Sequence, residues 1–341
     1  MEYIRHGGIS RRELLKLAAA GGAGLLLGPA VVRALSGEVG AAGPDARRVW
    51  AWSDSHLGGN VADHAGREGA EWMQLCMKDL KDKLSPVDYA LPLGDITDDG
   101  TEEQVQQYVE LRRAAGVGTW YDLAGNHDYA AVADGCWAKL VDRPIRYIVL
   151  DGNCAWFIIG ANQGRDVGWQ PKPVLAWLRR VLAEHQDKNV IVCTHQPVCG
   201  TVASSTGEGA YLSLAGPAKE SFPNNAKPFD DLLKEVRVDL WLCGHVHGGK
   251  RSPRHIARRG ATTFINVSAM GRMYNTGACT SCLLEMRAGQ KEMLARCRNH
   301  ESGAFVEDQQ VRVEFPNPWR FAAKPELIPA SSGLTPAAVP A

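Results

Sequence analysis

The sequence predicts an α/β (α+β) fold in which two mixed β-sheets pack together and helices cover their outer faces. Strand-length apolar runs first alternate with amphipathic helical patterns, and strand-like runs then follow one another towards the end of the chain. The turn Asp151-Gly152-Asn153, between two apolar runs, is typical of a β-hairpin. The hairpin indicates that the sheets are not purely parallel.

The first 34 residues have the pattern of an export signal. Ser10-Arg11-Arg12-Glu13-Leu14-Leu15-Lys16 precedes a mildly apolar, Gly/Ala-rich run over 17–32. The pattern resembles the twin-arginine signal peptide of bacteria, although Leu14 stands where Phe is common. The run is shorter than the ~20 residues that span a bilayer, so we expect no stable membrane span after cleavage. An amphipathic first helix is the alternative.

The expected domain organisation follows from this leader. We expect cleavage after residue 34, a linker over 35–46, one domain over 47–315 and a Pro/Ala-rich tail over 316–341. The twin-arginine translocase would be a partner during export, and the mature protein would be periplasmic or extracellular. Without residues 1–34 the chain has 33 basic and 36 acidic residues, a net charge of about −3, which gives no electrostatic case for nucleic acid as a partner.

The elements of the domain can be predicted in chain order. Helical spacing or capping signals indicate helices near residues 68–84, 101–114, 130–140, 173–185 and 229–236. Apolar runs indicate strands at residues 49–52, 89–93, 118–124, 145–150, 155–159, 190–193, 239–243, 263–267, 281–286 and 311–315. We expect the last three runs to form a further sheet. Residues 196–227 have no sustained periodicity, and a loop of this length is more often functional than neutral.

Five of these strands end in residues that can bind metal ions. The residues are Asp54 and His56, Asp95, Asn126 and His127, His195, and His245 and His247. Ligands gather at the carboxyl ends of strands in open α/β sheets. An unpaired imidazole or carboxylate is costly to bury there unless a cation compensates it, so the pattern indicates a metal site.

The order of these blocks resembles the calcineurin-like metallophosphoesterase superfamily, in particular its cyclic-nucleotide phosphodiesterase-like branch. The blocks are Asp54-Ser55-His56, Gly94-Asp95, Gly125-Asn126-His127-Asp128, His195 and Gly244-His245-Val246-His247. The resemblance implies a four-layer αββα sandwich with a dinuclear metal site at the strand ends. One divalent ion would be held by Asp54, His56, Asp95 and His247, and the other by Asp95, Asn126, His195 and His245.

The resemblance also implies the reaction. A metal-bridging hydroxide would attack the phosphorus of a phosphate ester, most simply a phosphodiester, in a small molecule or nucleotide. His127 would donate the leaving-group proton as general acid, Asp128 would favour its imidazolium form, and Asn126 and His127 would contact the substrate. Purple acid phosphatases carry Tyr where this chain has Asp98, so a ferric ion is less supported; Mn, Fe and Zn remain open.

Two other readings of the site stay open. A phosphomonoesterase or nucleotidase would use the same residues, and a non-catalytic scaffold would keep the fold as a protein-binding surface. Substrate choice would depend on loops 57–68 and 196–227, and the sequence of these loops does not indicate a particular substrate.

The remaining Cys and His residues are expected to have structural roles or to lie at the surface. The nine Cys are an odd number, and the pair Cys279 and Cys282 is compatible with either a local disulfide or inert packing. The His residues that fit none of the blocks are expected at the surface: His64, His185, His255 and His300.

Overall fold

The computed structural model describes residues 45–160, 172–203, 227–248, 254–272 and 278–330. The expected signal peptide, most of the linker and much of the loop 196–227 lie outside these residues, as does the end of the expected tail. Within the described chain no helix is both long and apolar enough to cross a bilayer.

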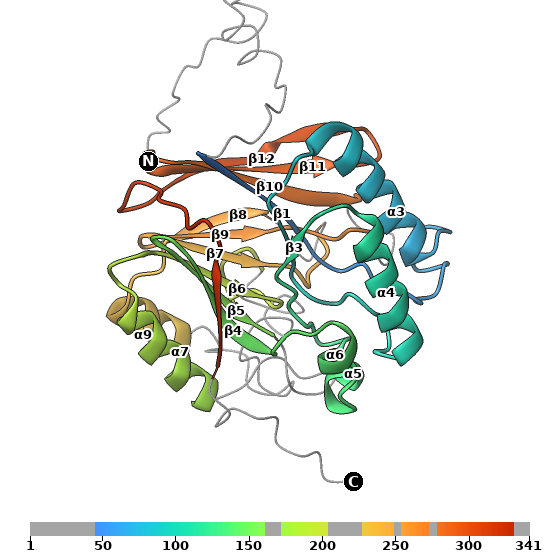
Figure 1. The fold of residues 1–341 in the computed structure, drawn as a ribbon, viewed down its shortest axis with the longest axis horizontal. Coiled ribbons are helices and arrows are strands. Elements are labelled where there is room, and N and C mark those ends of the chain that lie inside the picture. Colours follow the sequence, from blue (N-terminus) through green and yellow to red (C-terminus); the bar gives the residue numbers. More distant parts are fainter. Residues whose placement is uncertain (1–44, 161–171, 204–226, 249–253, 273–277, 331–341) are drawn as a thin grey trace, which may run out of the picture. The chain divides into compact units, whose positions relative to one another are not determined.

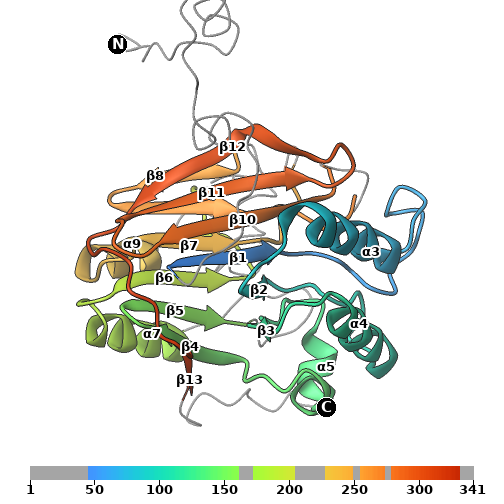
Figure 2. The same cartoon turned by 45° about the horizontal axis from the view of Figure 1, so that its top comes forward.

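Two β-sheets form the centre of the domain (Figures 1 and 2), and the first has the strand order β12-β11-β10-β1-β2-β3. Its strands are β1 (Ala46–Trp52), β2 (Tyr89–Pro92), β3 (Thr119–Trp120), β10 (Thr280–Arg287), β11 (Glu292–Asn299) and β12 (Ala304–Glu314). β1, β2 and β3 run parallel, whereas β1, β10, β11 and β12 pair antiparallel.

The second sheet has the order β13-β4-β5-β6-β7-β9-β8. Its strands are β4 (Arg146–Asp151), β5 (Cys154–Ile159), β6 (Asn189–Thr194), β7 (Leu240–Cys243), β8 (Ile256–Arg259), β9 (Thr262–Asn266) and β13 (Glu326–Pro329). β5, β6, β7 and β9 are parallel, and β4 and β5 form the predicted hairpin. Both sheets are therefore mixed, as the sequence predicts.

Helices cover the outer face of each sheet (Figure 1). The helices are α3 (Gly69–Asp79), followed by a π-helical turn η1 (Leu80–Leu84), and α4 (Glu102–Ala114), α5 (Tyr129–Ala133), α6 (Cys136–Leu140), α7 (Lys172–Glu184) and α9 (Lys227–Glu235). The outer aromatic side chains of the first sheet contact Tyr108 of α4, and the outer face of the second packs on α7 and α9. The four-layer αββα arrangement is confirmed.

The period of two along each strand explains this layering. In β1, Val49 and Ala51 enter the core between the sheets, whereas Trp50 and Trp52 point to the helical side, where Trp52 meets Tyr108. All these side chains are buried, so both faces of the strand are covered. Burying both faces of the central strands leaves their carboxyl ends as the places where polar side chains can gather.

Two expectations about the end of the chain are wrong. The last three apolar runs do not form a sheet of their own, because β9 joins the second sheet while β10 and β12 join the first. Residues 316–330 are not a tail, because β13 pairs with β4 and Trp319 is fully buried against Phe315. The domain therefore extends to Ala330, where the described chain ends.

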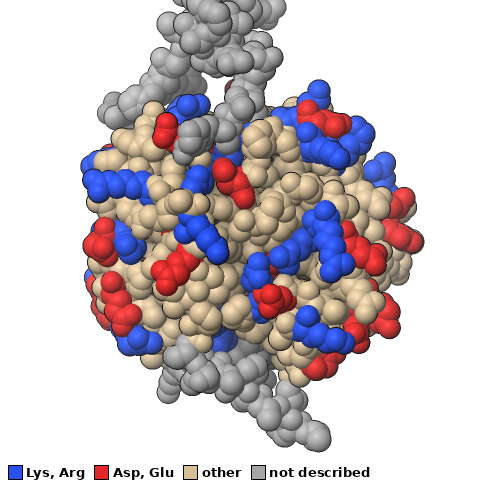
Figure 3. Space-filling model, viewed as in Figure 1, with Lys and Arg blue, Asp and Glu red and all other residues tan. Residues whose placement is uncertain are grey.

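Charges are mixed on the surface that Figure 3 shows. Lys and Arg side chains alternate with Asp and Glu side chains on this face, without a broad region of one sign. The mixture agrees with the balanced composition of the chain.

Candidate metal centre

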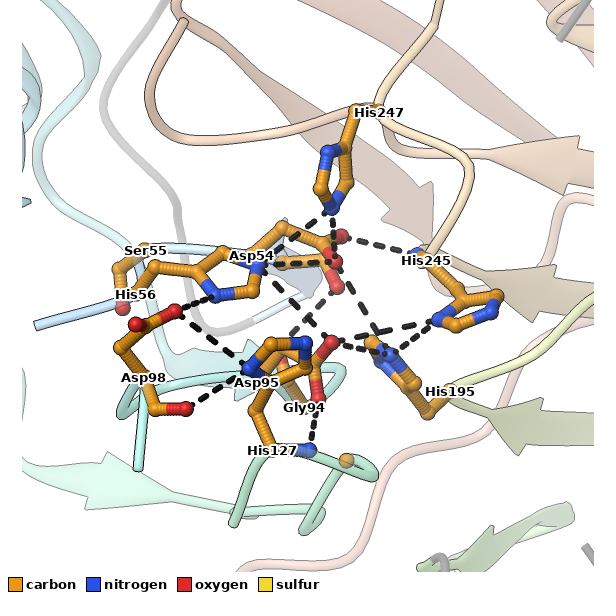
Figure 4. A network of polar contacts seen from close by, with 12 residues as sticks. Asp54, Ser55, His56, Gly94, Asp95, Asp98, His127, His195, His245 and His247 are labelled. Carbon is orange, nitrogen blue, oxygen red and sulfur yellow. Dashed lines mark hydrogen bonds and ion pairs between the residues drawn. The ribbon is translucent and has the colours of Figure 1, made fainter. Parts of the chain in front are cut away.

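The predicted ligand residues meet at the carboxyl ends of strands from both sheets (Figure 4). Asp54 and His56 follow β1, His195 follows β6, and His245 and His247 follow β7. Backbone hydrogen bonds hold neighbouring strand ends together within each sheet, from Asp54 N to Gly94 O at 2.9 Å in the first and from Gly244 N to His195 O at 2.8 Å in the second. Between the sheets, the His245 backbone N–H donates to Asp54 Oδ2 at 2.9 Å. The site is therefore built where the two sheets converge.

The backbone at the ligand residues is unusual. Asp54, His56, Asp95, His245 and His247 all have positive φ, between 44° and 69°. These five are among eight non-glycine residues with positive φ in the described chain. Such conformations cost of order 1–3 kcal/mol each and concentrate at functional sites, where the surrounding structure enforces them. Here they turn consecutive side chains back towards one point.

Glycines in the motifs allow the strand ends to approach. A Cβ atom on Gly125 would lie 2.2 Å from the backbone N of Asp95, and one on Gly244 would lie 1.9 Å from Ser53 Oγ. Both distances are far below contact, so only glycine fits. Gly125 and Gly244, which precede Asn126 and His245, are thus packing requirements of the site.

The candidate ligand atoms of the described residues form three groups, and the atoms of each group lie within 4.8 Å of one another. One group is His56, Asp95 and His127. The other two are Asp54, His56 and His247, and Asp95, His195 and His245. These last two groups follow the two ligand sets implied by the sequence resemblance. Asp95 lies between them, because its Oδ2 is 3.9 Å from His56 Nε2 and 2.9 Å from His195 Nε2.

The donor set fits a pair of divalent cations. Nε2 atoms of His56 and His247 face each other at 3.4 Å, and His195 Nε2 lies 3.0 Å from His245 Nδ1. In each pair at most one nitrogen can donate to the other, whereas a cation could accept a lone pair from both. Imidazole nitrogens and carboxylate oxygens are ligands for Mn, Fe and Zn.

Burial and charge set the protonation of these side chains. Burial opposes ionisation of Asp54, but His247 and His195 outweigh it and lower its pKa to about 2. Burial also opposes the charge of His195, yet Asp95 and Asp54 raise its pKa to about 9. Burial lowers the pKa of His245 to about 4. The ionised carboxylates of Asp54 and Asp95 bring two negative charges against one positive charge on His195, so this group of side chains attracts cations.

Asp98 is the residue that holds His127, through its backbone carbonyl and its carboxylate. His127 Nδ1 lies 2.7 Å from the carbonyl O of Asp98 and 3.4 Å from its Oδ1. The same Oδ1 lies 3.0 Å from His56 Nδ1. Burial raises the pKa of Asp98, but its hydrogen bonds with His127 and His56 lower it overall. Asp98 thereby connects the predicted general acid to a predicted metal ligand.

The expectation that Asp128 acts on the His127 ring is wrong. The Asp128 carboxylate is fully buried and accepts hydrogen bonds from the backbone N–H groups of Ile96, Thr97 and Gly125 and from the Thr97 hydroxyl. Its oxygens therefore turn back to the neighbouring loops. Burial and then Asp95 raise its pKa. Asp128 fixes the loops that carry Asp95 and His127 instead of tuning the imidazole.

The structure places the other sequence-predicted residues as follows. Asn126 is buried in the same loop, and its ligand role stays a prediction. His64 and His300 are buried, so their expected surface position is wrong. The 6.0 Å separation of the His64 and His56 rings places His64 beside the site. No sequence spacing marks His64 as part of the site. Asp98 could have been proposed from the sequence, because it lies only three residues after the predicted ligand Asp95.

A family model identifies the family to which this arrangement of residues belongs. Residues 47–249 match the model for the calcineurin-like phosphoesterase. The chain belongs to the calcineurin-like phosphoesterases. The match includes every predicted ligand. The domain is therefore a metallophosphoesterase, which is a metal-dependent phosphoric ester hydrolase.

Curated relatives of this phosphoesterase are named as phosphodiesterases. The chain is 27% identical over 186 residues to a probable glycerophosphodiester phosphodiesterase of Arcobacter nitrofigilis, covering 50% of this chain and 61% of the relative. It is 25% identical over 181 residues to a 3′,5′-cyclic-nucleotide phosphodiesterase of Nostoc sp., covering 52% and 63%. The chain thus spans less than two thirds of either relative.

Solved structures share the fold at low identity. A purple acid phosphatase from yellow lupin (Lupinus luteus) has a TM-score of 0.53 at 13% identity, covering 81% of this chain and 55% of that chain. GAP50, described as the anchor in the inner membrane complex of Plasmodium, has a TM-score of 0.55 at 12% identity, covering 80% and 90%. These likenesses support the architecture alone.

Proposed function

We propose that this phosphoesterase is an exported phosphodiesterase that uses two divalent ions, Mn, Fe or Zn. The observation that carries the proposal is a pair of His/Asp clusters that lie beside His127, with the Asp95 carboxylate between them. Asp54, His56, Asp95 and His247 would hold one ion, and Asp95, Asn126, His195 and His245 the other. When bound, the two ions would lower the pKa of a water molecule and polarise the phosphoryl oxygens.

The protein's own groups orient the donors before a metal binds. His195 Nδ1 lies 2.7 Å from the carbonyl oxygen of Leu93, which directs Nε2 of His195 towards Asp95. The His245 backbone N–H donates to Asp54 Oδ2 at 2.9 Å, which fixes the carboxylate plane. Such outer contacts set the tautomer and orientation of ligands, and losing one typically costs 10- to 100-fold in affinity or activity.

His127 is proposed as the general acid. Its backbone N–H donates to Asp95 Oδ1 at 2.8 Å, so the residue is tied to the shared carboxylate. Its Nδ1 is engaged by Asp98, so Nε2 would be the nitrogen that protonates the departing alkoxide. The side chain is 13% exposed, so a substrate oxygen can approach it. Proton donation of this kind contributes about 10²–10⁴-fold to a rate.

A diester substrate is supported by the names of both relatives. A phosphomonoesterase or nucleotidase is the alternative on the same site. A binding scaffold is a weaker candidate: the fold that GAP50 shares does not decide it, but this chain retains the predicted ligands and the acid.

The test combines metal analysis with hydrolysis by the chain that lacks residues 1–34. We expect close to two divalent ions per chain and fastest turnover of a diester, such as bis(p-nitrophenyl) phosphate or a 3′,5′-cyclic nucleotide. Faster turnover of p-nitrophenyl phosphate would favour the monoesterase. Less than one ion per chain and no turnover of any ester would refute the proposal.

Export is tested separately. The support is the Arg11-Arg12 pair ahead of an apolar run. Replacing both Arg11 and Arg12 with Lys should retain the full-length protein in the cytoplasm of a bacterium that has a twin-arginine translocase. Unchanged appearance of processed protein in the periplasm or medium would contradict this route.

A further inference from the structure

Two cysteines that are far apart in the sequence face each other outside the metal centre. The Sγ atoms of Cys76, on α3, and Cys279, just before β10, are 3.2 Å apart although 203 positions separate them in the chain. Both side chains are fully buried. Cys282, the expected alternative partner of Cys279, instead lies opposite Cys297 in the antiparallel pair of β10 and β11.

The neighbours of both cysteines fix their positions. Asp79 lies one helical turn after Cys76, and its carboxylate accepts from Arg298 Nε at 2.6 Å and from Arg298 Nη2 at 2.7 Å. His300 Nδ1 lies 2.9 Å from the same carboxylate. The His300 backbone N–H donates to the carbonyl of Cys279 at 2.9 Å. Helix and strand are thus held in register at this contact.

A polar cluster accompanies the contact, which we call the α3 anchor and define by Asp79, Ser281, Arg298 and His300. Ser281 Oγ lies 2.8 Å from His300 Nε2 and accepts from Trp50 Nε1 at 2.8 Å. The order Ser281, His300, Asp79 matches that of a hydrolase triad, but Ser281 is fully buried and its oxygen is already engaged. The α3 anchor is therefore structural.

We propose that Cys76 and Cys279 form a structural disulfide that covalently joins α3 to the start of β10. Each thiol loses a proton as the S–S bond forms, and the two electrons reduce an external disulfide to two thiols. In a cell this oxidant is a thiol–disulfide oxidoreductase of an oxidising compartment, and in a test tube it is oxidised glutathione. The proposal concerns the folded domain and does not depend on the proposed catalytic activity.

The surroundings of the pair favour a stable bond over a reactive one. Burial raises the pKa of the Cys76 thiol well above its usual range, which makes it a poor attacking group once folded. Cys279 Sγ also contacts the carbonyl of Met270 at 2.9 Å, and the Met270 N–H donates to Ser53 O at 2.8 Å. The bond would therefore brace a segment that touches the residue before Asp54.

The decisive measurement is disulfide mapping of the full chain. The protein is equilibrated in a buffer of reduced and oxidised glutathione, with urea from zero up to concentrations through its unfolding transition, so that burial does not block exchange. It is then quenched with acid, alkylated and digested without reduction. We expect a cross-linked peptide pair that contains Cys76 and Cys279. Its absence at every urea concentration, or a link from Cys76 to another cysteine, would overturn the proposal.

A second measurement uses thermal stability. A bond that closes a loop of about 200 residues should raise the midpoint of thermal unfolding by about 5 °C in oxidised over reduced protein. Cys76→Ala and Cys279→Ala should each abolish that difference, whereas the matched control Cys193→Ala, at a buried thiol of β6, should keep it. An equal oxidised-to-reduced difference in all three variants would contradict the assignment.

Discussion

The metal centre and the α3 anchor both combine imidazoles with buried or partly buried carboxylates, but the hydrogen-bond partners of these groups differ. In the α3 anchor, Asp79 has Arg298 and His300 as hydrogen-bond partners, and His300 has Ser281 on its other nitrogen. In the metal centre, pairs of imidazole nitrogens face each other around Asp54 and Asp95 instead. The first cluster is complete within the protein, whereas the second requires cations.

Backbone conformation separates the two clusters as well. Five residues of the metal centre have positive φ, whereas none of the four residues of the α3 anchor is among the described residues with positive φ. Asp79 ends α3, Ser281 and Arg298 lie in β10 and β11, and His300 directly follows β11. The side chains of the α3 anchor therefore meet without a positive φ at any of these residues. Backbone strain together with imidazole nitrogens that face one another is therefore a better guide to function than the residue types alone.

The largest expected effect comes from the residue that both metal groups share. Asp95→Asn should remove bound metal and lower kcat/KM for a diester by about 10³-fold or more, because one charged oxygen donor near both groups is lost. Metal analysis and hydrolysis rates measure this. Asp99→Asn, an exposed carboxylate on the same loop, is the control and should retain both properties. Retention of two ions per chain by Asp95→Asn would exclude a shared ligand.

Removing the general acid should separate metal binding from turnover. His127→Ala should retain the metal ions but lower kcat by about 10²–10⁴-fold for esters with poor leaving groups. For a p-nitrophenyl leaving group the loss should be much smaller, because that group needs little protonation. A series of aryl diesters measures the difference. The same loss across the series would show that His127 does not donate the proton.

Asp98, and not Asp128, lies beside the His127 ring, so substitutions of these two carboxylates should have smaller and contrasting effects. Asp98→Asn should lower kcat/KM by about 10- to 100-fold, because Asp98 orients both His127 and His56. Asp128→Ala should chiefly destabilise the fold, by about 2–3 kcal/mol, because buried backbone N–H groups lose their acceptor. Hydrolysis rates and urea unfolding of both variants distinguish these roles. A greater dependence on leaving group for Asp128→Ala than for Asp98→Asn would restore the original assignment.

The smallest expected effect tests the α3 anchor. Burial raises the pKa of Asp79, but Arg298 and His300 lower it overall. A lowered folded pKa means that the contribution is present above the unfolded pKa of about 4 and is lost as the pH falls through the folded value. Asp79→Asn should therefore cost about 1 kcal/mol near pH 6, allowing for partial exposure and solvent screening, and progressively less below pH 4.

Thermal unfolding across this pH range measures that difference, and Ser281→Ala provides the control. Ser281→Ala removes an uncharged partner, so its cost should depend little on the ionisation of Asp79. Neither variant should change diester hydrolysis per bound metal. A stability gap for Asp79→Asn that widens as the pH falls would contradict the sign of the pKa shift.

Much of the candidate site is visible in the sequence because its parts are local. An apolar run that ends in glycine and then a polar residue is a short-range pattern, and Gly125-Asn126-His127 and Gly244-His245 show it. The fold class follows from the same patterns, since alternating strands and helices with one hairpin permit few layer arrangements. Residue types and their order thus predicted the layers and most of the candidate ligands that the structure brings together.

Long-range contacts determined the features that the sequence patterns did not predict. The Asp128 side chain is adjacent to His127 in the sequence, but it turns to backbone N–H groups on another loop, and Asp98 takes the position beside the ring. Likewise, Cys279 faces Cys76, and β13 pairs with β4, across separations that no local pattern encodes. Side-chain direction and strand partners depend on how distant segments pack, so only the tertiary structure determined them.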